Sequence, residues 1–184
     1  MKHLPTHPLA AICLSALGLT ACSSMSIPST YSQAELPAAV QVPAGHKVDM
    51  EAVGVGQITY ECRAKKDTAA EHEWVFVGPD AKLQARSGAV IGKYWGPPAT
   101  WENNDGSKLT ATQVAVAPAG TGNIPLQLVK ANPANGTGVM QGVTYIQRVA
   151  TKGGVAPNIA CGVSNMGSKQ VVQYQADYIF WKAV

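Results

Sequence analysis

The stretch from residue 142 to residue 161, GVTYIQRVATKGGVAPNIAC, constrains the fold most, because it joins a clear strand pattern to a cysteine that needs a distant partner. β-Branched and aromatic residues dominate positions 143–151 and alternate between two faces, as in a β-strand. The strand should end at Lys152-Gly153-Gly154, since glycine tolerates the positive φ of a sharp turn. The segment therefore predicts a strand, a corner, and Cys161 at the start of a new segment.

The same pattern recurs along the chain and predicts an all-β fold. No window sustains a 3.6-residue period, and the sequence holds 18 glycines and 12 prolines, so helix should be scarce. We expect one β-sandwich or barrel-like domain of about seven or more short strands after a signal peptide and a disordered tether. The candidate strands are 55–64, 72–77, 89–95, 108–117, 124–131, 139–150 and 171–181. The turn signals between them include Gly78-Pro79-Asp80, Asn104-Asp105-Gly106, Asn135-Gly136 and Asn165-Met166-Gly167.

The last candidate strand shows the clearest two-faced alternation. Gln173, Gln175 and Asp177 should face outward. The opposite face should point to the core and carries Val172, Tyr174, Ala176, Tyr178 and Phe180.

The N-terminus reads as an export signal. Residues 9–19, LAAICLSALGL, form an apolar run of signal-peptide length that is too short to span a bilayer as a stable helix. Leu19-Thr20-Ala21-Cys22 resembles the bacterial lipobox, which implies that residues 1–21 are removed and Cys22 is acylated. The alternative is a plain secreted protein in which Cys22 has no lipid. Ser23 gives no aspartate-type retention signal, so the lipobox resemblance implies a protein of the bacterial cell envelope, lipid-anchored at the outer membrane.

Residues 22–47 are predicted to be a flexible tether behind the lipidated cysteine. They are rich in small and polar residues, and Pro28, Pro37 and Pro43 interrupt any periodicity. The remaining residues, 48–184, are expected to form one β domain, and the chain is too short for a second.

The four cysteines have separate expected fates. Cys13 leaves with the signal peptide and Cys22 carries lipid, so Cys62 and Cys161 remain. Export to an oxidising compartment favours a disulfide between them. Two buried free thiols or a metal pair are the alternatives, although neither cysteine has a neighbouring Cys or His at ligand spacing.

Charge argues against nucleic-acid binding. The chain has 14 Lys and Arg against 11 Asp and Glu, without a basic stripe. Its densest basic cluster, Arg63, Lys65 and Lys66, is followed at once by acidic residues. We expect a solvated loop there.

Several motifs together resemble a family of secreted bacterial and fungal domains of unknown function, family 3455. They are GQITYEC at 56–62, WVF at 74–76, PDAKL at 79–83, WE at 101–102, DGS at 105–107, IP at 124–125, the whole 142–161 stretch, and QADYIF at 175–180. The resemblance spans residues 53–181 and implies the boundaries of the domain, but no activity and no cofactor. The chain departs from the family pattern at Tyr94, where a histidine is usual, and in residues 96–101, which are one residue longer.

Aromatic and polar residues cluster at Tyr94, Trp95, Trp101, Glu102 and Asp105 and form the candidate ligand site. Flat rings beside carboxylates can bind sugars or other planar ligands, which suggests a carbohydrate or an envelope protein as partner. The alternative is that the tryptophans belong to the core of a hairpin and that 103–106 is its turn. Adjacent acidic and amide residues lack the spacing of a calcium loop.

No catalytic motif is present, so three functions stay open. Glu71-His72-Glu73 is better explained as a solvated strand entry than as a metal site, and Gly54-Val55-Gly56 leads into a strand, where it cannot bind phosphate on a helix. The leading hypothesis is a non-catalytic, lipid-anchored binding or structural module without cofactor or metal. The alternatives are a hydrolase, using Glu102 or Asp105 with Glu61 or Asp177, and a carrier of a small apolar molecule inside a barrel.

Arg148 is predicted to need a charged partner. It shares its strand face with Ile146, and a guanidinium on a partly apolar face is costly without a carboxylate or carbonyls. We expect a structural ion pair with Asp177, the alternative being that both residues are solvated and independent.

Overall fold

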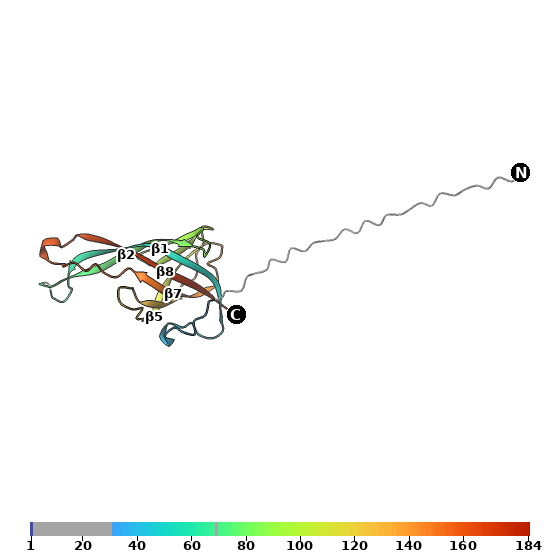
Figure 1. Ribbon diagram of the computed structural model, residues 1–184, viewed down its shortest axis with the longest axis horizontal. Helices are drawn as coiled ribbons and strands as arrows, with labels where there is room; N and C mark the ends of the chain where they lie inside the picture. Colours follow the sequence, from blue (N-terminus) through green and yellow to red (C-terminus); the bar gives the residue numbers. More distant parts are fainter. Residues whose placement is uncertain (2–30, 69) are drawn as a thin grey trace.

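The computed structural model describes Met1 and residues 31–68 and 70–184 (Figure 1). Residues 2–21 of the predicted signal peptide and the lipidation residue Cys22 lie outside these residues. Within the described part of the chain, no helix is long and apolar enough to cross a membrane.

Eight antiparallel strands close into one barrel in simple sequence order, with β1 paired to β8 (Figure 1). The all-β prediction is confirmed, and of its two architectures the barrel is correct. The strands are β1 His46–Ala64, β2 His72–Gln84, β3 Val90–Trp95, β4 Thr100–Asn103, β5 Lys108–Ala117, β6 Leu126–Ala131, β7 Val143–Gly153 and β8 Lys169–Ala183. Two short 3₁₀ helices, η1 Ala38–Val40 and η2 Val163–Asn165, accompany them.

The inner faces of the strands fill the barrel with large side chains. On β8, Tyr174, Ala176, Tyr178 and Phe180 are all buried, as the alternation of this strand predicts. Facing strands supply Leu83, Trp101, Leu109 and Ile146, and the β6–β7 connection supplies Met140. Fully burying one such side chain stabilises the fold by about 1.5–3 kcal/mol, so this interior is the main source of stability.

Two glycines of β1 make room for this packing. A Cβ on Gly54 would collide with the ring of Tyr178, and one on Gly56 would collide with the Asp80 carbonyl and with Ala81. Gly54 and Gly56 are therefore required by close packing inside the barrel.

Two strands differ from their predictions. β2 runs through Gly78-Pro79-Asp80, which was predicted to be a turn. Pairing between β2 and β3 begins only at Asp80, so Pro79 has no β3 partner. Proline is tolerated there because the N–H that it lacks is not needed for pairing with β3. The prediction missed β4 entirely, because four residues carry too little alternation to be recognised.

The N-terminal segment, residues 31–43, corrects the predicted tether. Val40 and Val42 are buried against the outer face of the barrel, in a second apolar cluster with Leu128, Val149 and Trp181. Residues 31–43 therefore belong to the folded domain. This part of the prediction was wrong because the apolar residues of the segment are few and widely spaced. They stabilise the segment only by packing against an apolar patch on the outer face of the barrel.

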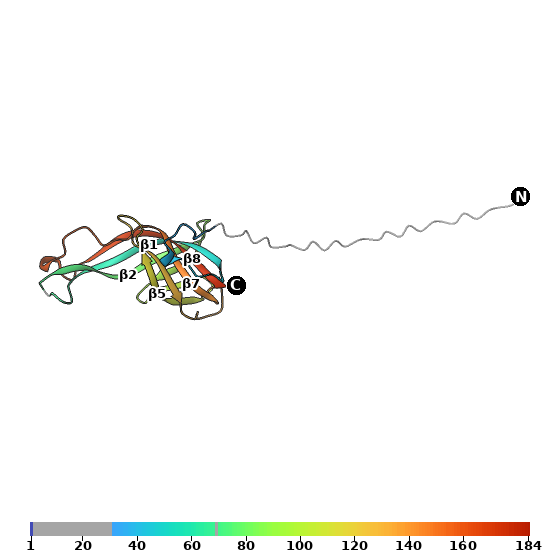
Figure 2. The same ribbon diagram turned by 90° about the horizontal axis from the view of Figure 1, so that it is seen from below.

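One end of the barrel, here called the loop end, carries the turns β1–β2, β3–β4, β5–β6 and β7–β8. Two of them, the β1–β2 hairpin and the β7–β8 loop, project beyond the barrel side by side, and the C-terminus lies at the opposite end (Figures 1 and 2). The loop end comprises residues 65–68, 70–71, 96–99, 118–125 and 154–168.

Candidate functional site

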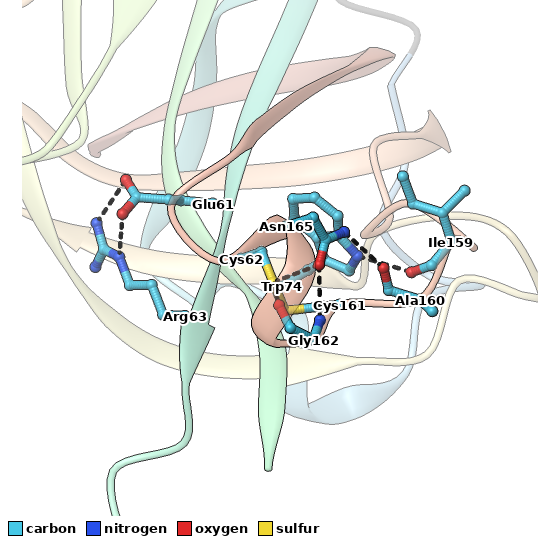
Figure 3. Close-up of a disulfide and its surroundings, with 9 residues drawn as sticks. All are labelled: Glu61, Cys62, Arg63, Trp74, Ile159, Ala160, Cys161, Gly162 and Asn165. Atoms are coloured by element: carbon cyan, nitrogen blue, oxygen red, sulfur yellow. Dashed lines mark hydrogen bonds and ion pairs between the residues drawn. A yellow bond between two sulfur atoms is a disulfide. The ribbon is translucent and has the colours of Figure 1, made fainter. Parts of the chain in front are cut away.

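The disulfide between Cys62 and Cys161 ties the two projecting segments of the loop end together (Figure 3). This confirms the predicted pairing. Around it, the Asn165 side chain accepts a hydrogen bond from the Gly162 N–H and donates one to the Ala160 carbonyl. The Trp74 indole N–H donates to the Ile159 carbonyl, so the β7–β8 loop is fixed against β2.

The predicted aromatic site is divided by the barrel wall. Tyr94 and Trp101 face inward and stack, with ring centroids 4.7 Å apart. Trp95 is next to Tyr94 in the strand and therefore faces outward, where the Lys93 ammonium lies 4.7 Å from its ring centroid. The three rings do not share a surface.

Glu102 and Asp105 are bound by other groups. Glu102 lies 3.6 Å from the Lys93 ammonium on the outer surface. Asp105 accepts hydrogen bonds from the hydroxyl and backbone N–H of Ser107 and from the backbone N–H of Val139, and these bonds lower the pKa of its carboxyl. Asp105 thus organises the β4–β5 turn, and the five predicted ligand residues do not form one site.

Tyr94 and Trp101 instead line an open cavity of about 230 Å³ at the loop end. It lies between the β3–β4 turn and the inner faces of β5, β6 and β7. The other residues that line it are Phe76, Pro79, Gly96, Pro97, Ala99, Ala111, Gln113, Gln127, Val129 and Arg148.

Arg148 reaches this cavity because of its register in the sheet. It lies opposite Tyr178 in β8 and Gln127 in β6, so all three side chains share the inner side. Asp177 lies opposite Val149, one position out of phase with Arg148, and faces outward. The predicted Arg148–Asp177 ion pair is therefore wrong.

Asp177 pairs with another arginine. Its carboxylate lies 2.7 Å from Arg86 Nη1, and Arg86 Nη2 lies 2.8 Å from the carboxylate of Glu51. This three-residue cluster joins β1, β8 and the β2–β3 turn on the outer surface.

The Arg148 guanidinium keeps donors free for a ligand. Its Nε and Nη2 donate to the Pro125 carbonyl at 3.2 and 3.0 Å. A guanidinium has five N–H groups, and two are used here, so three have no acceptor in the described part of the chain. No carboxylate of residues 31–68 or 70–184 forms an ion pair with Arg148.

Four tyrosines surround this positive charge. Burial raises the pKa of Tyr60, Tyr94, Tyr174 and Tyr178, and the nearby Arg148 charge only partly offsets that rise. The hydroxyls therefore stay protonated at neutral pH. The Tyr60 hydroxyl donates to the Gly154 carbonyl at 2.8 Å, and the hydroxyls of Tyr174 and Tyr178 are hydrogen-bonded at 3.3 Å. Of these four tyrosines, Tyr94 lines the cavity.

Trp101 adds one more donor that has no acceptor in the described part of the chain. Its indole Nε1 is buried, and no described residue accepts a hydrogen bond from it. An unpaired buried donor costs about 1–3 kcal/mol, so a water molecule or ligand atom that accepts from it would stabilise the site.

The sequence signal for this site was weak. Arg148 was recognised as a charge on a partly apolar face, but the residues that complete the cavity come from five strands and one turn. Among the described residues, no group of three His, Cys, Asp or Glu side chains is placed to hold a metal ion. Glu71 pairs with Lys65 at 2.6 Å, as expected for a solvated loop.

Comparisons with known proteins identify the family. No match was found among curated proteins or among solved structures. A family model described as a protein of unknown function, DUF3455, matches residues 43–182. This range contains the eight strands of the barrel except the last residue of β8, together with the disulfide and the cavity at the loop end. The protein therefore belongs to the DUF3455 family.

Proposed function

We propose that this protein is a lipid-anchored module of the bacterial envelope that binds a small molecule in the loop-end cavity without catalysing a reaction. The observation that carries the proposal is the Arg148 guanidinium, which lines an open cavity with three N–H groups that have no described acceptor. Binding sites combine apolar walls with a few oriented polar groups, and this cavity has both.

The anchoring part of the proposal rests on the sequence before Cys22. A disulfide fits an exported protein, since the cytosol keeps thiols reduced. If Cys22 is the acylated N-terminus, the link to Tyr31, where the described domain starts, spans at most about 30 Å when fully extended. The barrel would then stay close to the lipid surface.

Intact-mass analysis of the protein from the membrane fraction tests the anchor. The proposal expects a mature chain that starts at Cys22 with added acyl mass, and it expects Cys22→Ser to release the protein into the soluble fraction. A soluble wild-type chain without lipid would refute it.

The two alternative functions have less support. The hydrolase hypothesis needs two carboxylates in one cleft, but Glu61, Glu102 and Asp177 are each paired with a basic side chain, and Asp105 is used in its turn. The carrier hypothesis needs a large internal cavity, but the centre of the barrel is filled by side chains such as Phe180.

A pair of β5 variants tests binding in the cavity. Ala111 lines it, so Ala111→Phe should fill it, whereas Val114→Phe adds the same ring at an exposed position of the same strand. Small molecules that raise the melting temperature of the wild-type domain should fail with Ala111→Phe and still act on Val114→Phe. Equal responses of both variants would place binding elsewhere and refute the proposal.

A further inference from the structure

We propose that the ligand of the loop-end cavity is a small organic anion whose carboxylate, or a similar oxyanion, binds the free edge of the Arg148 guanidinium. This inference rests on the proposed function and names the chemical class of its ligand. Three features of the cavity support it: the orientation of Arg148, the apolar walls, and the size.

The orientation of Arg148 favours an oxyanion. Nε and one N–H of Nη2 are held by the Pro125 carbonyl, which fixes the plane of the guanidinium. The Nη1 N–H groups and the second Nη2 N–H remain on the adjacent edge, and two parallel N–H groups of this kind match the two oxygens of a carboxylate.

None of the described residues that line the cavity carries a negative charge. Of the residues that line the cavity, Arg148 alone is charged. Asp80 is close enough to affect the Tyr174 hydroxyl, but Asp80 is exposed and lies opposite Gln57 and Trp95 on the outer side of the sheet. An anion that enters the cavity would therefore meet a cation without a carboxylate partner.

The remaining walls favour a compact apolar body. Phe76 is half exposed at 52%, although its ring contacts Tyr60 edge-on with centroids 6.1 Å apart. Pro97 and Val129 extend this surface, and Tyr94 and Trp101 offer flat rings. Gln127 and Gln113 bond to each other at 2.7 Å, which makes them less available as ligands for a sugar.

The size limits the ligand. A volume of about 230 Å³ is below the roughly 300–1,000 Å³ of sites for drug-sized molecules. A single ring or a short chain that carries one acid group fits this space better than an oligosaccharide.

Calorimetric titration with benzoate and its neutral analogue benzamide tests the inference on the wild-type domain. The two probes share shape and ring, so the ratio of their affinities isolates the charge. Benzoate should bind about tenfold more tightly or better, since hydrogen bonds to a charged acceptor are markedly stronger than neutral ones. Equal affinities, or no detectable binding of benzoate, would overturn the inference.

Variants of Arg148 assign the preference to its side chain. Arg148→Gln should reduce the affinity for benzoate to that for benzamide, and Arg148→Lys should keep part of the preference because it retains the charge. Arg86→Gln is the matched control, because it removes an arginine from the outer surface. A benzoate preference that survives in Arg148→Gln would overturn the inference, and the wild-type ratio stays decisive even if that variant fails to fold.

Inorganic phosphate separates the two parts of the proposed ligand. Phosphate should bind much more weakly than benzoate, since it lacks the ring. If phosphate bound as tightly through Arg148, the organic part of the inference would be wrong. A neutral cavity ligand that is blocked by Ala111→Phe but indifferent to Arg148→Gln would overturn this inference and leave the proposed function intact.

Discussion

Gln147 should be one of the most sensitive polar positions of the fold, and Gln147→Leu tests why the N-terminal segment is attached. The side chain projects from the outer face of β7 and is fully buried beneath the N-terminal segment 31–43. Its Oε1 accepts hydrogen bonds from the Tyr31 hydroxyl at 3.1 Å and from Trp181 Nε1 at 2.9 Å. Its Nε2 donates to Gln33 Oε1 at 3.0 Å and to the Val40 carbonyl at 2.7 Å.

The magnitude follows from these four bonds. Each contributes about 0.5–1.5 kcal/mol net, and leucine would leave the buried Trp181 N–H and Val40 carbonyl without partners. We expect Gln147→Leu to lower the free energy of unfolding by about 3–5 kcal/mol. For a domain of this size, that loss corresponds to a fall in melting temperature of roughly 6–20 °C.

Urea unfolding and limited proteolysis measure the two consequences. The variant should lose stability and become sensitive to cleavage within residues 31–43, because the segment loses its central attachment. Gln173→Leu changes an exposed glutamine of β8 and should shift stability by less than about 0.5 kcal/mol. If Gln147→Leu cost less than about 1 kcal/mol, the segment would be held by apolar contacts alone and the reasoning would be wrong.

Three further predictions concern stability. The disulfide closes a loop with a sequence separation of 99, so Cys161→Ser should cost up to about 4.7 kcal/mol in thermal or chemical unfolding, and an unchanged melting temperature would contradict this. In double-mutant cycles, the effects of Asp177→Asn and Arg148→Met on stability should be additive, and a coupling energy between them would contradict the register. Asp177→Asn and Arg86→Met should show a coupling energy of at most about 1 kcal/mol, because Arg86 is half exposed. Burial and nearby carboxylates raise the pKa of Tyr31 to about 12, so the folded state holds this proton more tightly than the unfolded chain. Stability should therefore fall as pH rises from about 10 to about 12, and Tyr31→Phe should make that fall shallower in pH-dependent unfolding.

Sequence patterns predicted the parts of the fold that depend on local alternation. β5 was predicted with its observed bounds, and the inner face of β8 was predicted residue by residue. The Cys62–Cys161 pairing was also predictable, because only two cysteines lie outside the predicted signal peptide and the predicted lipobox.

Features that depend on which strands become neighbours were not predictable. Arg148 and Asp177 lie on adjacent strands, but a shift of one position places them on opposite faces of the sheet. Pro79 predicts a turn, and only the strand pairing shows that this part of β2 has no hydrogen-bonded neighbour on its β3 side. The buried Val40 depends on an outer apolar face that no local pattern reveals.

The candidate site follows the same rule. Tyr94 and Trp101 were among the predicted ligand residues and do line the cavity, but Trp95 was grouped with them by proximity in sequence although it faces outward. The charge of Arg148 on a partly apolar strand face predicts a structural ion pair and not a place in a cavity. Its place in the cavity required the closed barrel, because β3 and β7 are far apart in the sequence.

Indole signals in a ¹H–¹⁵N spectrum test the central claim most directly, because the four tryptophans report on different surfaces. The Nε1–H groups of Trp74 and Trp181 are hydrogen-bonded to the Ile159 carbonyl and to Gln147, and Trp95 faces outward. Trp101 lines the cavity, and its Nε1–H has no acceptor among the described residues. On titration with benzoate, the Trp101 indole signal should shift in wild-type protein and should shift less at the same benzoate concentration in Arg148→Gln, while the other three remain unchanged. A shift confined to Trp95, or a Trp101 shift of equal size in Arg148→Gln, would contradict the account.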